Sequence, residues 1–77
     1  MTDNNLNNRI TEHKLIRIKD VIKLTSLSKS YIYQLSKENK FPKSVQIIAG
    51  GTAVAWVDSE IYNWINQRIA ERGGVQL

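Results

Sequence analysis

The hydrophobic positions between Ile18 and Pro42 follow the spacing of two short amphipathic helices joined by a tight turn. The apolar residues assigned to the inward side of this segment and its turn are Val21, Ile22, Leu24, Leu27, Ile32 and Leu35. Ser28 can cap the second helix through its hydroxyl, and Pro42 disfavours the helical region at the preceding Phe41. The spacing therefore predicts a helix-turn-helix.

After Pro42 the pattern changes from helical to extended. Residues 44–48 and 53–57 are rich in Val, Ile and Trp, and the turn between them contains the pair Gly50-Gly51, which adopts positive φ without steric cost. A β-hairpin in this place is typical of the wing of a winged helix-turn-helix, although its apolar residues could instead simply cap the core. We expect the strands to serve the core and the tip to meet a partner.

The last periodic segment predicts a helix that begins at Asp58 as its cap, with Glu60 near the positive end of the helix dipole. Its apolar stripe consists of Ile61, Trp64, Ile65 and Ile69. This stripe must pack against the back of the helix-turn-helix and the hairpin, so Trp64 is interpreted as a core residue. Gly73-Gly74 is expected to end the helix.

The chain of 77 residues has room for one small domain. Residues 1–13 are expected to form a disordered leader that contains His13, a solvated side chain with no role. Residues 14–72 are expected to form the winged helix-turn-helix, mainly α with a small β-hairpin, after a brief extended segment over residues 15–18. Residues 73–77 are expected to be a flexible tail.

Composition excludes several classes of protein. The chain has no cysteine, which excludes disulfides and thiolate metal sites, and no apolar run of membrane-spanning length. His13 is the only histidine, no base is placed to activate a serine, and no glycine-rich phosphate loop is present. We therefore expect a cytoplasmic protein that is not an enzyme, holds no metal or cofactor, and has no membrane partner.

Positive charge is concentrated in the predicted helix-turn-helix. The whole chain carries 11 Lys and Arg against 7 Asp and Glu, a net charge of +4. Residues 14–43 hold eight of these bases and two of the acids, a balance of +6, whereas residues 44–57 carry no charge. Such a distribution is an electrostatic footprint for nucleic acid. The alternative is a solvated lysine-rich face without a partner.

The outward side of the second predicted helix suits double-stranded DNA. Its residues are Lys29, Ser30, Tyr33, Gln34 and Lys37. Gln34 can pair bidentately with an adenine edge, while Tyr33 can donate to a phosphate and lay its ring against sugar or a thymine methyl. The lysines assigned to phosphates, where a flexible point charge suffices, are Lys19, Lys29, Lys37, Lys40 and Lys43.

Five short motifs over residues 15–72 resemble those of the AlpA family of phage-type regulators. In chain order they are IRIKDV, LSKSYIYQL, FPKSV, AVAW and SEIYNWINQR. The resemblance implies a winged helix-turn-helix like that of excisionases and MerR-type DNA-binding domains. It also implies DNA contacts from the second helix at Lys29, Ser30, Tyr31, Tyr33 and Gln34, which extends the base-reading set to Ser30, Tyr31, Tyr33 and Gln34.

One position departs from the family pattern. The residue before Ala53 is often arginine in the family, and here it is Thr52. The expected wing tip of Gly50, Gly51 and Thr52 is therefore neutral, which weakens an electrostatic minor-groove contact. The amides of Gly51 and Thr52 can still bond a phosphate.

These observations lead to an expected function and an alternative. We expect a sequence-specific DNA-binding protein of a prophage or genomic island, which acts as a transcriptional regulator, an excisionase or both, and binds and bends DNA. Its small size predicts several copies on repeated sites, and a tyrosine integrase is a further expected partner. The alternative is a protein-interaction module that recruits an integrase or polymerase through Trp56, Trp64 and the Tyr31/Tyr33 pair.

Overall fold

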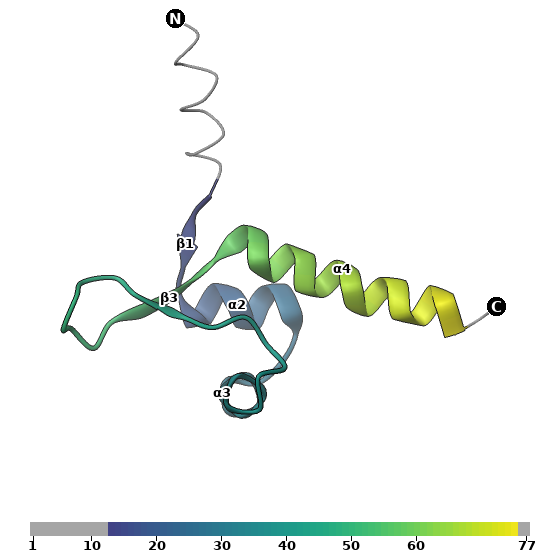
Figure 1. Cartoon of the computed structure of the whole chain (residues 1–77), viewed down its shortest axis with the longest axis horizontal. Coiled ribbons are helices and arrows are strands. Elements are labelled where there is room, and N and C mark those ends of the chain that lie inside the picture. Colours follow the sequence, from purple (N-terminus) through teal and green to yellow (C-terminus); the bar gives the residue numbers. More distant parts are fainter. Residues whose placement is uncertain (1–12, 76–77) are drawn as a thin grey trace, which may run out of the picture.

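The computed structural model describes residues 13–75, so residues 1–12 of the predicted leader and residues 76–77 of the predicted tail lie outside the described residues. The elements in chain order are β1 (Leu15–Ile16), α2 (Ile18–Thr25), α3 (Lys29–Lys37), β2 (Val45–Gln46), β3 (Val54–Val57) and α4 (Asp58–Val75). Figure 1 shows α2 and α4 above α3, with the β2–β3 hairpin projecting to one side. This architecture confirms a mainly α fold with a small hairpin, a winged helix-turn-helix.

The turn between α2 and α3 is held by two hydroxyl groups. The Thr25 hydroxyl donates to the Val21 carbonyl at 2.8 Å and accepts from the Leu27 amide at 3.2 Å. The Ser28 hydroxyl accepts from the Tyr31 amide at 3.1 Å, which confirms Ser28 as the cap of α3. Helix α2 ends at Thr25 and is capped by Ser26, whose φ of 63° lies in the left-handed region. These bonds set the angle at which α3 leaves α2.

The end of α3 precedes Pro42 by several residues because a Schellman motif terminates it. Asn39 has a φ of 62°, its amide donates to the Ser36 carbonyl at 3.1 Å, and the Lys40 amide donates to the Leu35 carbonyl at 2.8 Å. The chain then turns back so that Phe41 enters the core. Asparagine tolerates this backbone conformation better than most residues, which is the local reason the helix stops here.

The sheet has three strands in the order β1-β3-β2, all antiparallel. The predicted hairpin is confirmed, with Val45 opposite Ala55 and Gln46 opposite Val54. The extended segment before α2 is a strand that pairs with the other end of β3, where Leu15 lies opposite Val57. Next to this pair, the Asp58 carboxylate accepts from the amides of Ser59 at 2.7 Å and Lys14 at 2.9 Å, so it joins β1 to the start of α4.

His13 lies at the same junction. Its Nδ1 is 2.8 Å from the Ser59 hydroxyl oxygen, in an exposed position. We expected a solvated side chain with no role, and the exposure agrees, but the contact gives His13 a structural position beside α4. The spacing of 46 residues between the two partners explains why local sequence pattern did not reveal it.

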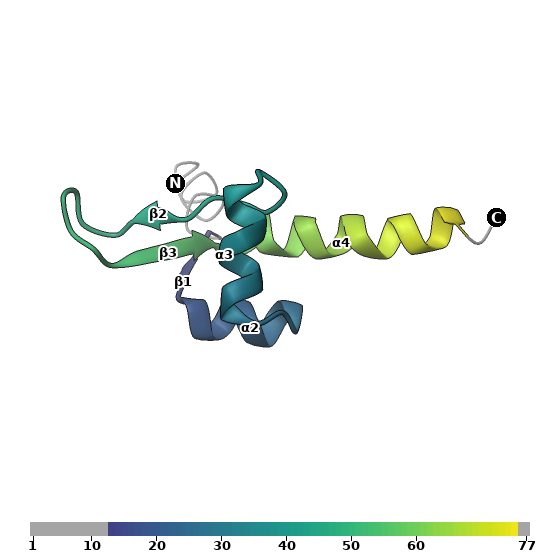
Figure 2. The same cartoon turned by 90° about the horizontal axis from the view of Figure 1, so that it is seen from below.

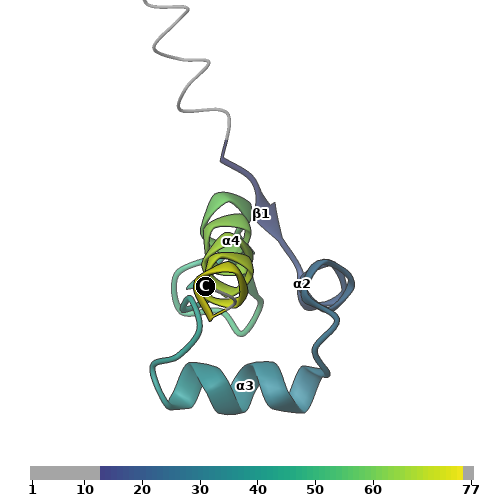
Figure 3. The ribbon, with the colours of Figure 1, turned by 90° about the vertical axis from the view of Figure 1, so that its right-hand side faces the viewer.

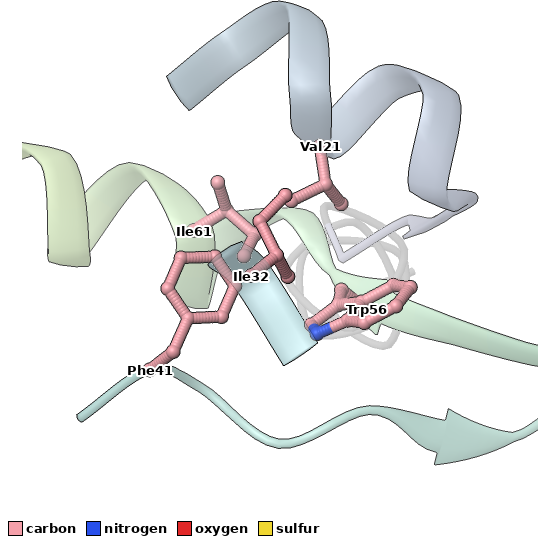
Figure 4. Close-up of a cluster of buried hydrophobic side chains, with 5 residues drawn as sticks. All are labelled: Val21, Ile32, Phe41, Trp56 and Ile61. Carbon is pink, nitrogen blue, oxygen red and sulfur yellow. The ribbon is translucent and has the colours of Figure 1, made fainter. Parts of the chain in front are cut away.

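The hydrophobic core takes one large residue from nearly every part of the fold (Figure 4). The buried cluster consists of Val21, Ile32, Phe41, Trp56 and Ile61. Trp64 is half-buried at the margin of this cluster, where its ring meets Phe41 edge to face with 4.9 Å between centroids. The prediction that Trp64 packs on the core is thus confirmed, although the residue lies at the margin of the core.

The outer part of α4 corrects two expectations. Ile69 is 50% exposed, because at about 1.5 Å per residue it lies roughly 12 Å beyond Ile61 along the helix axis, past the edge of the small core. The helix also continues through Gly73-Gly74 to Val75. Glycine weakens a helix by about 1 kcal/mol relative to alanine but does not by itself end one. Figure 2 shows this part of α4 extending away from the hairpin.

The inward side of α2 is narrower than its apolar pattern suggests. Leu24, assigned to the inward side of α2, is 37% exposed, whereas Val21 is fully buried. An eight-residue helix can turn only a narrow stripe toward its neighbours, so the residue at the edge of that stripe stays in contact with solvent.

Among residues 13–75, no helix is both long and apolar enough to cross a membrane.

Candidate nucleic-acid interface

The outer face of α3 is free of other elements. Figure 3 shows α3 along the lower edge of the molecule, with α2 and α4 both above it. Ser30, Tyr33, Gln34 and Lys37 are exposed, and each lies three or four residues from two of the others, which places them on one helical face. The opposite side of the helix is occupied by Ile32, which is fully buried. The structure therefore brings together four of the residues assigned to DNA.

A small notch joins this face to the start of the hairpin. Its lining residues are Tyr33, Ser36, Lys37, Lys43 and Ser44. The Ser36 hydroxyl oxygen is buried without a hydrogen-bond partner among the described residues, and the Tyr33 ring lies 6.1 Å from the buried Trp56 ring. The ammonium groups of the two lysines and the hydroxyl groups of Tyr33 and Ser44 are donors that suit a phosphate. Lys37 and Lys43, six residues apart in the chain, thus belong to one site.

Gln34 is already engaged in a hydrogen bond. Its Nε2 donates to the Glu38 carboxylate at 3.3 Å, and the other oxygen of that carboxylate lies 3.6 Å from the Lys40 ammonium. All three side chains are exposed. The bond to Glu38 favours one orientation of the Gln34 amide while leaving its Oε1 and the second N–H free. Lys40, assigned to a phosphate, is thus paired with an acid and is less available than Lys37.

The two tyrosines of α3 lie on different flanks. Tyr33 borders the notch beside the hairpin, whereas Tyr31 lines a groove between α3 and α4. Side chains that share this groove with Tyr31 include Leu27, Leu35, Phe41, Trp64 and Arg68. The Arg68 guanidinium lies 4.9 Å from the centre of the Trp64 ring. Tyr31 therefore lies on the flank of α3 that faces α4, three residues from Gln34 on the helical surface, whereas Tyr33 lies on the flank that faces the hairpin.

The other residues assigned to DNA contacts lie around the outer face of α3. Lys19 is exposed near the start of α2, and Lys29 is the first residue of α3. At the hairpin tip, Gly50 has a φ of 80° and the Gly51 amide donates to the Ile48 carbonyl at 2.9 Å. Thr52 is exposed beside them. The tip projects beyond the helices (Figure 2), so it lies apart from the outer face of α3.

Three residues of this interface were missed by sequence reasoning. Ser36 and Ser44 line the notch, and Glu38 holds Gln34. The spacing of Gln34 and Glu38 on one helical face was a signal that could have revealed their bond. No local signal could have revealed the notch, because it forms only when the chain reverses after α3.

For the alternative function, a protein-interaction module, one residue of the predicted adhesive surface is wrong. Trp56 is 1% exposed and belongs to the core cluster, so it cannot form an adhesive surface with the tyrosines. Trp64 and Tyr31 do line one groove. Burial of Trp56 follows from its place in the central strand of the sheet, between two neighbouring strands and against α2 and α4.

The exposed polar helix, the helix that supports it and the flanking hairpin define a small winged helix-turn-helix of the DNA-binding class. A family model described as "Prophage CP4-57 regulatory protein (AlpA)" matches residues 14–69, and the chain belongs to this AlpA family of phage regulatory proteins. It is 41% identical over 63 residues to "Uncharacterized protein ORF88" of Enterobacteria phage P4, covering 82% of this chain and 69% of that protein. No solved structure is significantly similar to the present chain.

Proposed function

We propose that this chain is a sequence-specific DNA-binding protein of a prophage or genomic island, acting as a transcriptional regulator, an excisionase or both. The observation that carries the proposal is the notch beside the outer face of α3, which both Lys37 and Lys43 line. A helix in the major groove places its ends and flanks near the phosphate backbone. Basic side chains gathered on one flank therefore support this placement.

The roles proposed for α3 follow from its geometry. Gln34 reads a base edge, with adenine as the preferred partner, and Ser30 lies beside it on the same face. Tyr33 and the two lysines of the notch hold one phosphate. Tyr31 lies on the flank of α3 that faces α4, so we propose that its contribution to base reading is the smallest of the four.

A domain of this size meets a short stretch of one groove, so useful specificity requires several copies or a partner. We propose that several copies bind repeated sites and bend the DNA between them. Bending costs on the order of 1 to 6 kcal/mol for a short site, and contacts between the copies and the bent DNA offset that cost. A tyrosine integrase bound nearby is the proposed partner in excision.

Fluorescence anisotropy with a labelled duplex tests the binding proposal. If about five bases meet phosphates, log K should fall with log salt at a slope of about −4 to −5, and Lys37→Ala and Lys43→Ala should each reduce the slope by about one. Mobility of circularly permuted fragments measures the bend, and a footprint counts the copies. A salt-independent affinity would refute the DNA-binding proposal, and a single protected site on straight DNA would refute cooperative bending.

The groove between α3 and α4 favours a protein contact as the second candidate function. It combines the exposed Tyr31 with the half-buried Trp64 beside Arg68. Tyrosine, tryptophan and arginine are the residues most often found at the centres of protein interfaces. Capture of an integrase or polymerase that survives nuclease treatment and is lost on Tyr31→Ser would support this candidate. Absence of catalysis stays a prediction.

A further inference from the structure

The tip of the β2–β3 hairpin carries an unusually exposed apolar side chain. Ile48 is 67% exposed, the highest value for a large hydrophobic residue among the described residues, and the neighbouring Ile47 is 38% exposed. Residues 44–57 include no charged side chain. Figure 1 shows the tip projecting beyond the helices, so nothing in the described part of the chain covers it. Two consecutive exposed isoleucines on a projecting tip are available to a partner.

Hydrogen bonds close the turn that begins at Ile48. The Gly51 amide donates to the Ile48 carbonyl at 2.9 Å and closes a four-residue turn, whose third residue, Gly50, has a φ of 80°. The Gln46 side-chain amide donates to the Gly51 carbonyl at 3.1 Å and ties the turn to β2. A position with this φ suits glycine. The turn therefore holds the backbone of Ile48 in one conformation before any partner arrives.

The hairpin is continuous with the proposed DNA-binding face. Lys43 and Ser44 line the notch next to Tyr33 of α3, and β2 begins at the following residue, Val45. With α3 in the major groove, a hairpin that leaves from its flank crosses the phosphate backbone toward the adjacent minor groove. The hairpin has no carboxylate to repel the phosphates on this path.

We infer that Ile48 is an apolar wedge that enters the minor groove next to the site of α3 and bends the DNA. This inference rests on the proposed DNA-binding function. Isoleucine is among the residues that insert between base steps and unstack them. Pyrimidine–purine steps such as TA and CA are the most easily kinked, so the wedge should prefer a site that has such a step under the hairpin. The neutral Thr52, in place of a cation, fits an apolar contact of this kind.

The test compares Ile48→Ser with Ile69→Ser, a control in which a similarly exposed isoleucine is replaced on the projecting part of α4. Both variants should melt at the temperature of the unaltered protein. Mobility of circularly permuted fragments should show that Ile48→Ser loses most of the bend and about tenfold in affinity, while keeping the same salt dependence. Ile48→Met should restore the bend, because methionine is also an intercalating residue. The control should bind and bend normally.

The outcomes separate the two proposals. If the unaltered protein fails to bind the duplex, the proposed function is wrong and the wedge is wrong with it. If it binds but Ile48→Ser bends DNA to the same degree, only the wedge is overturned. If Ile48→Ser instead converts a dimer in DNA-free solution to a monomer and leaves the bend intact, the tip is a self-association contact and the wedge is again overturned.

Discussion

The indole nitrogen of Trp64 donates a 2.9 Å hydrogen bond to the backbone carbonyl of Lys40. This bond joins α4 to the segment that leaves α3, while the ring of Trp64 packs against Phe41. Trp64 therefore holds in place the chain reversal that brings Lys43 back beside α3. Its effect on DNA binding should be indirect, through the position of that reversal.

Replacing Trp64 should lower stability in two steps. Trp64→Phe loses the hydrogen bond but keeps an aromatic ring, and should cost about 0.5 to 1.5 kcal/mol in the free energy of unfolding. Trp64→Ala should cost about 2 to 4 kcal/mol, less than for a fully buried tryptophan because the ring is half-exposed. Urea melts measure both values. A Trp64→Ala protein that melts normally yet fails to bind DNA would show that Trp64 is a contact residue instead.

Two serines at the start of α3 should behave differently. Ser28→Ala removes the cap bond to the Tyr31 amide and should lower the free energy of unfolding by about 1 kcal/mol. Ser30→Ala lies on the exposed face and should leave stability within about 0.5 kcal/mol while weakening binding to the preferred site. Thermal melts and anisotropy on the same pair of variants check this division. Equal stabilities for both variants would contradict the cap assignment.

Gln34 and Lys37 should separate specificity from affinity. Gln34→Ala should cost about 1 to 3 kcal/mol on the preferred site and little on random DNA, because only a base contact depends on sequence. Lys37→Ala should weaken binding to both DNAs by a similar amount, since a phosphate is present in every sequence. Competition between specific and random duplexes gives both numbers. Equal losses on the two DNAs for Gln34→Ala would show that Gln34 is not a reader.

Glu38 should restrain binding to DNA in general. Its carboxylate lies on the side of α3 near Gln34 and pairs with Lys40 at 3.6 Å. Glu38→Gln removes a negative charge and frees that lysine, so non-specific affinity should rise and the salt slope should steepen by about one. Discrimination between preferred and random DNA should fall, because the Gln34 amide loses its charged partner. Unchanged discrimination would mean that Glu38 does not orient Gln34.

Local pattern was sufficient for most of the fold. The spacing of apolar residues predicted both helices of the helix-turn-helix, and the pair Gly50-Gly51 predicted the hairpin turn, because these features depend on neighbours within a few residues. The same pattern misjudged Ile69 and the end of α4. Periodicity reports which residues could share an apolar face, but it does not report how far the core beneath that face extends.

The sequence by itself determined the polar face of α3, its serine cap, the concentration of positive charge and membership in a recognisable family, all of which follow from residue identity and short spacing. Only the tertiary structure decided which side chains meet across long separations. It buried Trp56 but left Trp64 at the margin, paired β1 with β3, and brought Lys37 and Lys43 into one notch. The physical reason is that the hydrophobic effect is non-directional. Burial of an apolar side chain is favourable against any apolar neighbour, so the packing of the whole chain decides which neighbour buries it.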